Sequence, residues 1–172
     1  MWQKRSYGAK KGASAKEKEP DASAANALNY MVGLLAKREH SQSELEQKAL
    51  RHYTQEAVDE ALTKCVENGY QSDERYAEML VRHMQFALYG PNKLRYEAMR
   101  KGADLSLVSD QIAEVDWDDL AYEALVKKYS MIELDYAQRN KALAYLTRRG
   151  FSPASSIKAL ERMKRELSED EY

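Results

Sequence analysis

Three histidines and one cysteine are the first residues of this 172-residue chain to test for metal binding or catalysis. No two of His40, His52 and His83 are four residues apart, and with Cys65 alone they offer no zinc-binding spacing. A catalytic histidine or cysteine needs a reacting partner and an orienting group, and the sequence offers no such constellation. No glycine-rich phosphate loop is present. We therefore expect no catalytic, cofactor-binding or metal-binding residues, and no enzymatic activity.

Basic side chains near two predicted helix corners are the best candidates for binding a partner. Acids such as Glu97 and Glu133 are interleaved with them, so the residues alone favour a merely solvated face. However, Lys141, Tyr145 and Arg148 share one helical face, and a basic stripe holding an aromatic ring can contact phosphates or stack a base. The candidate partner-binding residues are Arg82, Lys93, Arg95, Arg100, Lys101, Lys141, Tyr145, Arg148 and Arg149.

The composition indicates a helical protein with little net charge. Glycine and proline are scarce, with 7 and 3 residues, and a third of the chain is charged. A net charge of −1 argues against a generic basic nucleic-acid binder, whose affinity comes largely from neutralising phosphates. A single cysteine suits a reducing cytosol, and no apolar run approaches the roughly 20 residues of a membrane span. We expect a cytoplasmic monomer without membrane contact.

Residues 39–70 contain the helical pattern that recurs along the chain. Ser41 and Glu44 match a capping box, in which each side chain bonds the other residue's backbone amide. Thr54 can cap a second helix, and Gly69 can end it in the left-handed conformation. This stretch therefore predicts a short helix, a tight corner and a longer helix.

The same plan recurs twice at a spacing of roughly 50 residues. The three corners are His52-Tyr53-Thr54, Gly102-Ala103-Asp104 and Gly150-Phe151-Ser152, each with a capping residue two positions after its first residue. We predict an all-α fold of three tandem three-helix repeats, stacked into an elongated, curved solenoid whose faces are buried mainly between neighbours. The expected divisions are a mobile basic arm (1–25), three repeats (26–70, 71–115 and 116–167) and an acidic frayed tail (168–172).

Apolar periodicity assigns the buried face of each predicted helix. It places His83, Leu107, Tyr136 and Ile157 among the inward-facing side chains. It also predicts a helix from about residue 133 to residue 149. Gly102 follows a helix end, so we expect it to have a positive φ.

Four segments together resemble the RecX family, bacterial modulators of the RecA recombinase. They are LLAKREHSQSELEQK from Leu34, ENGYQSDERYAE from Glu67, YGPNKLRYEAMRKGAD from Tyr89 and LTRRGFS from Leu146. The resemblance covers about residues 28–160. The sequence departs from the commoner pattern at Gln71, where an aliphatic residue usually stands, and before Tyr89, where a basic pair is usual.

The resemblance implies a regulator of DNA recombination and repair that binds the RecA filament on single-stranded DNA. By docking in the filament groove, such a protein would inhibit filament extension, ATP hydrolysis, strand exchange and repressor cleavage, with a weak contact to single-stranded DNA at most. The alternative is a helical DNA-binding module whose helix-turn-helix-like corners act without RecA. A steep salt dependence of binding to naked single-stranded DNA would favour this alternative.

Overall fold

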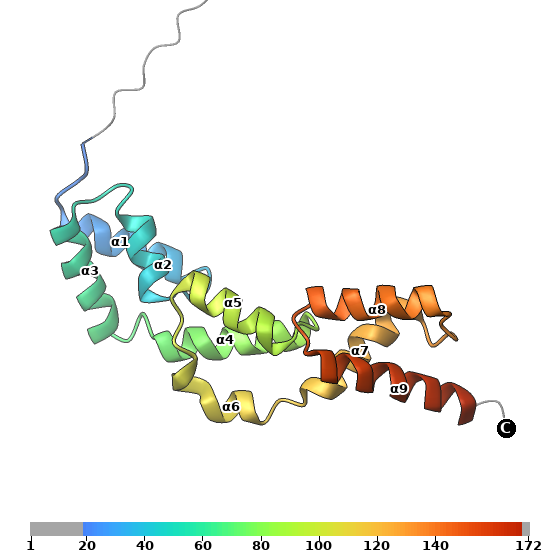
Figure 1. Ribbon diagram of the computed structural model, residues 1–172. Helices are drawn as coiled ribbons and strands as arrows, with labels where there is room; N and C mark the ends of the chain where they lie inside the picture. The colour runs from blue at the N-terminus through green and yellow to red at the C-terminus, as the bar shows by residue number, and fades with distance from the viewer. Residues whose placement is uncertain (1–18, 170–172) are drawn as a thin grey trace, which may run out of the picture.

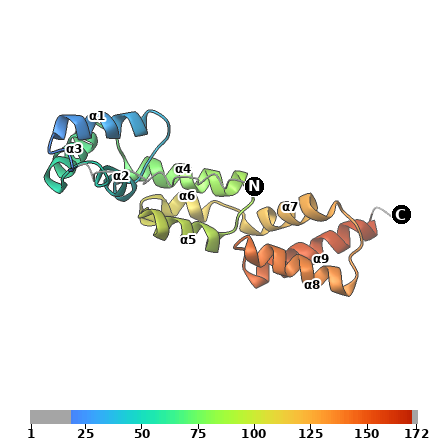
Figure 2. The ribbon, with the colours of Figure 1, turned by 90° about the horizontal axis from the view of Figure 1, so that it is seen from above.

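The computed structural model describes residues 19–169, in which every regular element is helical. Three groups of helices lie one after another in an elongated, curved row (Figure 1), and the view turned by 90° shows the same row (Figure 2). The described residues contain one strand-like pairing, an isolated bridge between Asp21 and Tyr53. The prediction of an all-α helical-repeat fold is confirmed. Residues 1–18 of the expected arm and residues 170–172 of the expected tail lie outside the described residues.

Repeat 1 consists of α1 (Ala24–Leu35), α2 (Gln42–Ala49) and α3 (Gln55–Glu67). Each helix begins after a hydroxyl residue whose side chain accepts a hydrogen bond from a backbone amide of the first turn. These caps are Ser23, Ser41 and Thr54. The two helices and the corner predicted for residues 39–70 are therefore present, and α1 packs mainly against α3.

Repeat 2 consists of α4 (Asp73–Phe86), α5 (Pro91–Lys101), the 3₁₀ helix η1 (Leu105–Val108) and α6 (Ser109–Ala113). Gly102 ends α5 with a φ of 64°, as predicted. Asp104 caps η1 instead of an α-helix. Because a 3₁₀ turn does not follow the 3.6-residue period, Leu107 is exposed and the prediction that it is buried was wrong.

Repeat 3 consists of α7 (Trp117–Tyr129), α8 (Tyr136–Arg148) and α9 (Pro153–Glu169). Helix α8 begins three residues later than predicted, because Asp135 caps it. Tyr136 then occupies the first turn and is 83% exposed, so its predicted burial was wrong. Ile157 is also exposed, because Ser156 and Leu160 occupy the buried side of α9. On α4, His83 points to solvent while Leu80 and Met84 are buried.

Each repeat has a hydrophobic core of its own. The clusters centre on Met31 and Val58 in repeat 1, on Val81 and Leu94 in repeat 2, and on Leu146 in repeat 3. We expected the apolar helix faces to be buried mainly between neighbouring repeats, and this expectation was wrong, because most of them are buried within one repeat. Sharing is confined to the junction of repeats 2 and 3, where the side chain of Leu88 joins the core of repeat 3 and that of Leu120 contacts both cores.

Neighbouring repeats are joined where the corner of one repeat lies against the start of the middle helix of the repeat before it. Gly90 donates its amide to the Arg149 carbonyl at 2.9 Å, and Asn92 donates to the Gly150 carbonyl at 3.0 Å. The backbones approach so closely that a Cβ atom built on Gly90 would lie 2.4 Å from Gly150. At the equivalent place between repeats 1 and 2, a Cβ atom on Gly102 would lie 2.5 Å from the Ser43 Cβ. Glycine is therefore required by space at Gly90, and at Gly102 by space and by a positive φ of 64°.

Candidate partner-binding site

The predicted basic residues of α5 are largely neutralised within their own helix. Lys93 and Arg100 both pair with Glu97, at 3.1 and 2.6 Å, and the hydrogen bond from Arg100 lowers the pKa of Glu97. Arg95 donates to the side-chain oxygen of Asn92 at 3.0 Å. The Lys93 ammonium also lies 5.2 Å from the centre of the Tyr96 ring. This group therefore presents aromatic and partly neutralised basic surface, not a row of free cations.

Lys101 belongs to the junction between repeats 1 and 2. Its ammonium lies 3.0 Å from a carboxylate oxygen of Glu44, and its carbonyl accepts a 2.5 Å hydrogen bond from the Ser41 hydroxyl. Glu44 is buried and also pairs with Arg38 at 2.7 Å. Burial alone would raise the pKa of Glu44, but the hydrogen bonds from Arg38 and Lys101 lower it to about 2. The Lys101 side chain thus stabilises the junction between repeats 1 and 2, and it remains 28% exposed to solvent.

The Ser41–Glu44 capping box is only half formed, and the reason is this junction. Ser41 accepts the amide of Glu44 at 3.1 Å, as predicted. The carboxylate of Glu44 faces Arg38, Lys101 and His40, whose pKa is lowered chiefly by burial. The unusual Gln71 is buried beside it and donates to the carbonyl of His40 at 3.2 Å. Sequence spacing could not reveal this cluster, since its members come from two repeats.

Arg149 belongs to the junction between repeats 2 and 3. Its guanidinium donates to the carbonyls of Ala87 and Leu88, at 2.5 and 3.3 Å. It also lies against two rings, 4.8 Å from the centre of Tyr89 and 5.4 Å from that of Tyr145. Leu88 has a φ of 54°, an uncommon backbone conformation for a leucine. Arg149 therefore holds an irregular stretch of chain between two repeats.

The remaining predicted residues differ in exposure and position. Lys141 and Arg148 are exposed, and neither forms an ion pair within residues 19–169. Tyr145 is half-buried, with its ring edge-on to Tyr129 at 6.4 Å. Arg82 pairs with Glu78 at 3.4 Å on α4, away from the others. Helices α5 and α8 lie on the same side of the molecule (Figures 1 and 2), and Lys93 of α5 and Arg149 after α8 both lie over the Tyr89 ring.

The charges divide the molecule into two sides. Helix α8 and the following Arg149 carry four basic residues and no acid. Between Lys101 and Lys127 the chain has seven acidic residues and no basic residue. Part of this acidic stretch forms η1 and α6, which lie on the side opposite α5 (Figure 1). Of the seven acids, Asp110 lies in α6, whereas Asp118 and Asp119 lie on α7 and pair with Lys158 and Arg162 of α9. The near-zero net charge therefore conceals a basic side formed by α5 and α8 and an acidic stretch that is partly neutralised by α9.

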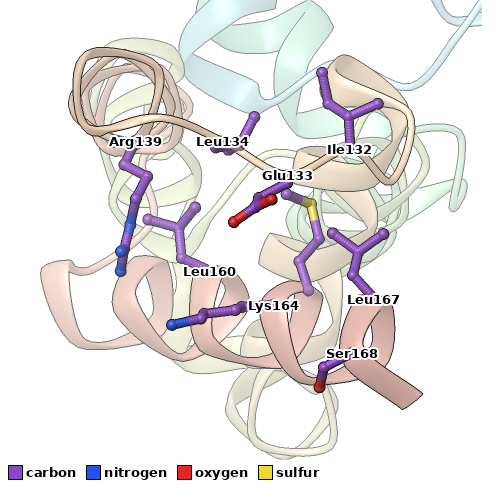
Figure 3. A pocket seen from close by; sticks show the side chains of 9 residues that line it. Ile132, Glu133, Leu134, Arg139, Leu160, Lys164, Leu167 and Ser168 are labelled. Atoms are coloured by element: carbon purple, nitrogen blue, oxygen red, sulfur yellow. The ribbon is translucent and has the colours of Figure 1, made fainter. Parts of the chain in front are cut away.

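The described residues offer few other features of a chemical site. No group of three or more His, Cys, Asp or Glu side chains among residues 19–169 could hold a metal ion. Cys65 is buried, and burial raises the pKa of its thiol. None of the helices within the described residues is long and apolar enough to cross a membrane. A pocket of about 410 Å³ lies in repeat 3 between the α7–α8 loop and α9 (Figure 3).

Fold and site together define a helical-repeat protein with a basic side formed by α5 and α8. Residues 27–65 match the family model described as RecX, first three-helix domain, and residues 72–110 match RecX, second three-helix domain. The chain is 33% identical over 128 residues to regulatory protein RecX of Actinobacillus pleuropneumoniae serotype 5b, covering 73% of this chain and 84% of that protein. It is 34% identical over 157 residues to regulatory protein RecX of Xanthomonas axonopodis pv. citri, covering 89% and 92%.

A solved structure shows the same fold. The crystal structure of RecX from Lactobacillus salivarius matches with a TM-score of 0.67 at 21% identity, covering 82% of this chain and 96% of that chain. The chain belongs to the RecX family of regulatory proteins, as the sequence motifs indicated.

Proposed function

We propose that this protein is a non-enzymatic regulator of recombination and repair that binds the RecA filament on single-stranded DNA. Binding limits filament extension, ATP hydrolysis and strand exchange, and the protein acts as a monomer in the cytoplasm. The observation that carries the proposal is membership of a family whose curated relatives are named regulatory protein RecX. The fold supports it, because an elongated row of repeats can contact several successive subunits of a filament.

The basic side formed by α5 and α8 supplies the contact surface in this proposal. Four of its cations, Arg95, Arg139, Lys141 and Arg148, are exposed and form no ion pair among the described residues. They would lie against acidic RecA surface or against the DNA phosphates. Arg149 and Lys101 contribute indirectly, because they fix the repeats that present this side.

A DNA-binding module that acts without RecA is the second candidate. The run of four basic residues on α8 and Arg149 favours it, since an acid-free basic helix can neutralise phosphates. The near-zero net charge and the internal pairing of Lys93 and Arg100 oppose it.

Fluorescence anisotropy with labelled single-stranded DNA distinguishes the two candidates. We expect the protein to bind RecA-coated DNA much more tightly than naked DNA. If the protein acts through the filament, its weak affinity for naked DNA should depend only slightly on salt concentration. Tight binding to naked DNA that falls steeply with salt, unchanged by RecA, would favour the second candidate.

A further inference from the structure

The pocket in repeat 3 has an apolar floor and a charged rim. Its volume of about 410 Å³ lies within the range of ligand-binding cavities. Leu134, Leu160, Met163 and Leu167 supply apolar surface from the α7–α8 loop and from α9. Leu160 and Met163 belong to the core of repeat 3, so the floor of the pocket is the edge of that core. Figure 3 shows Arg139 and Lys164 extending on one side of this pocket and Ile132 and Leu167 on the other.

The loop that forms one wall is unusual in its backbone and in its exposed side chain. Ser130 and Met131 have consecutive positive φ values, 56° and 50°. Non-glycine residues in this region carry a conformational cost, and they cluster at ligand-binding and switch segments. The loop presents Ile132, an aliphatic side chain that is 47% exposed at the pocket.

The charged rim indicates the sign of the occupant. Within residues 19–169, neither Arg139 on α8 nor Lys164 on α9 forms an ion pair. Two other cations of α9, Lys158 and Arg162, are both paired with acids. Glu133 is the one acid among the nine lining residues, and Figure 3 shows its carboxylate extending into the middle of the pocket, so the two cations exceed the acid by one charge. The rim is therefore net positive, and its two cations remain able to bind a carboxylate of another molecule.

We propose that this pocket receives an acidic amphipathic segment of the protein partner. Apolar side chains of the segment enter between Ile132 and Leu160, and a flanking carboxylate of the segment lies against Arg139 and Lys164. This is helix-in-groove recognition, in which apolar anchors give affinity and the rim charges give specificity. A nucleic acid would fit the apolar floor poorly, because backbone phosphates need cations and not aliphatic surface. The inference rests on the proposed function, in which the partner is RecA.

The test measures binding of the full chain to RecA-coated single-stranded DNA by co-sedimentation. Ile132→Glu places an anion at the exposed mouth of the pocket, and we expect it to weaken binding at least tenfold. The matched control is Phe86→Glu, which puts the same charge on a side chain that is 89% exposed and lies outside this pocket. We expect this control to bind like the parent.

A second pair of variants tests the rim without changing the apolar floor. Arg139→Glu with Lys164→Glu should also weaken binding, whereas Lys127→Glu with Lys128→Glu, an equal charge change on exposed residues of α7, should not. Circular dichroism melting of all four variants establishes that each is folded.

Three results would overturn the inference. The first is that the Ile132→Glu variant binds the filament as tightly as the parent protein, which would refute the role of the pocket but not the proposed function. The second is concentration-dependent dimerisation abolished by Ile132→Glu, which would make a second copy of the chain the occupant. The third is a parent protein that does not bind the filament at all, which would refute both proposals.

Discussion

Single residues fix how the repeats are joined. Glu44 is the clearest example, because its buried carboxylate accepts hydrogen bonds from Arg38 of its own repeat and Lys101 of the next. A buried charge is tolerated only when it is paired and hydrogen-bonded, and Glu44 meets this condition through two repeats at once.

Glu44→Gln should therefore destabilise the protein in a pH-dependent way. The pKa of Glu44 is about 2 in the fold and 4.5 ordinarily, so its contribution is present above pH 4.5 and is lost as the pH falls toward 2. The shift corresponds to about 3 kcal/mol. Urea unfolding should show this difference at pH 7 and a shrinking difference below pH 4.5. Glu56→Gln, an exposed site on α3, is the control and should show little effect; a pH-independent difference for Glu44→Gln would contradict the explanation.

Gly102→Val should destabilise the corner between repeats 1 and 2 by more than backbone strain alone. Positive φ at a β-branched residue costs roughly 1–3 kcal/mol. The added Cβ would also lie 2.5 Å from Ser43. Gly69→Val separates the two effects, because Gly69 has a similar φ of 69° and open space around it. Chemical denaturation should rank Gly102→Val as the less stable variant, and equal losses would show that the contact with Ser43 relaxes freely.

At the scale of elements, the corners act as connectors that repeat along the chain. The corner of repeat 3 lies against the start of α5, and the corner of repeat 2 lies against the start of α2. At the corner of repeat 1, the contact comes from Asp21, which precedes α1. Its amide donates to the carbonyl of His52 at 2.8 Å, and its carbonyl accepts from Thr54 at 3.0 Å. All three corners are therefore held by a neighbouring segment, through backbone hydrogen bonds at the first and third and through the Ser41 hydroxyl at the second.

Arg148 and Arg149 should have different roles, although they are adjacent and equally charged. Arg149→Glu removes the hydrogen bonds to Ala87 and Leu88, so it should lower the melting temperature by several degrees. Arg148→Glu changes an exposed residue and should leave the melting temperature nearly unchanged while weakening inhibition of RecA. Lys37→Glu, an equal charge change on an exposed residue beyond α1, is the control for inhibition. If Arg148→Glu and Lys37→Glu inhibit equally, Arg148 belongs to a solvated face.

How much the sequence could predict differs between elements and junctions. The caps, the three corners and the positive φ of Gly102 follow from local chemistry, and the structure has them. Local periodicity failed where the period changes, as in η1, or where a cap moves the start of a helix, as at Asp135. The interrepeat contacts of Glu44 and Arg149 could not be predicted, because they join residues about 60 positions apart.

At the scale of the whole molecule, separation of charge gives an elongated protein two different sides. The acid-free helix α8 and the partly neutralised helix α5 share one side, and helix α6, which belongs to the acidic stretch, lies on the side opposite α5 (Figure 1). A molecule with near-zero net charge can therefore be oriented by a charged partner without binding every polyanion. This arrangement fits a regulator that recognises one assembly and ignores bulk DNA.

The rate of ATP hydrolysis by RecA on single-stranded DNA tests the central claim most directly. The rate is measured with and without this protein, at a fixed RecA concentration and at increasing ratios of this protein to RecA. We predict that the rate falls at ratios well below one molecule per RecA subunit, because an elongated protein that blocks extension affects many subunits. An unchanged rate at equimolar protein, with RecA filaments present and the added protein folded, would contradict the proposed function.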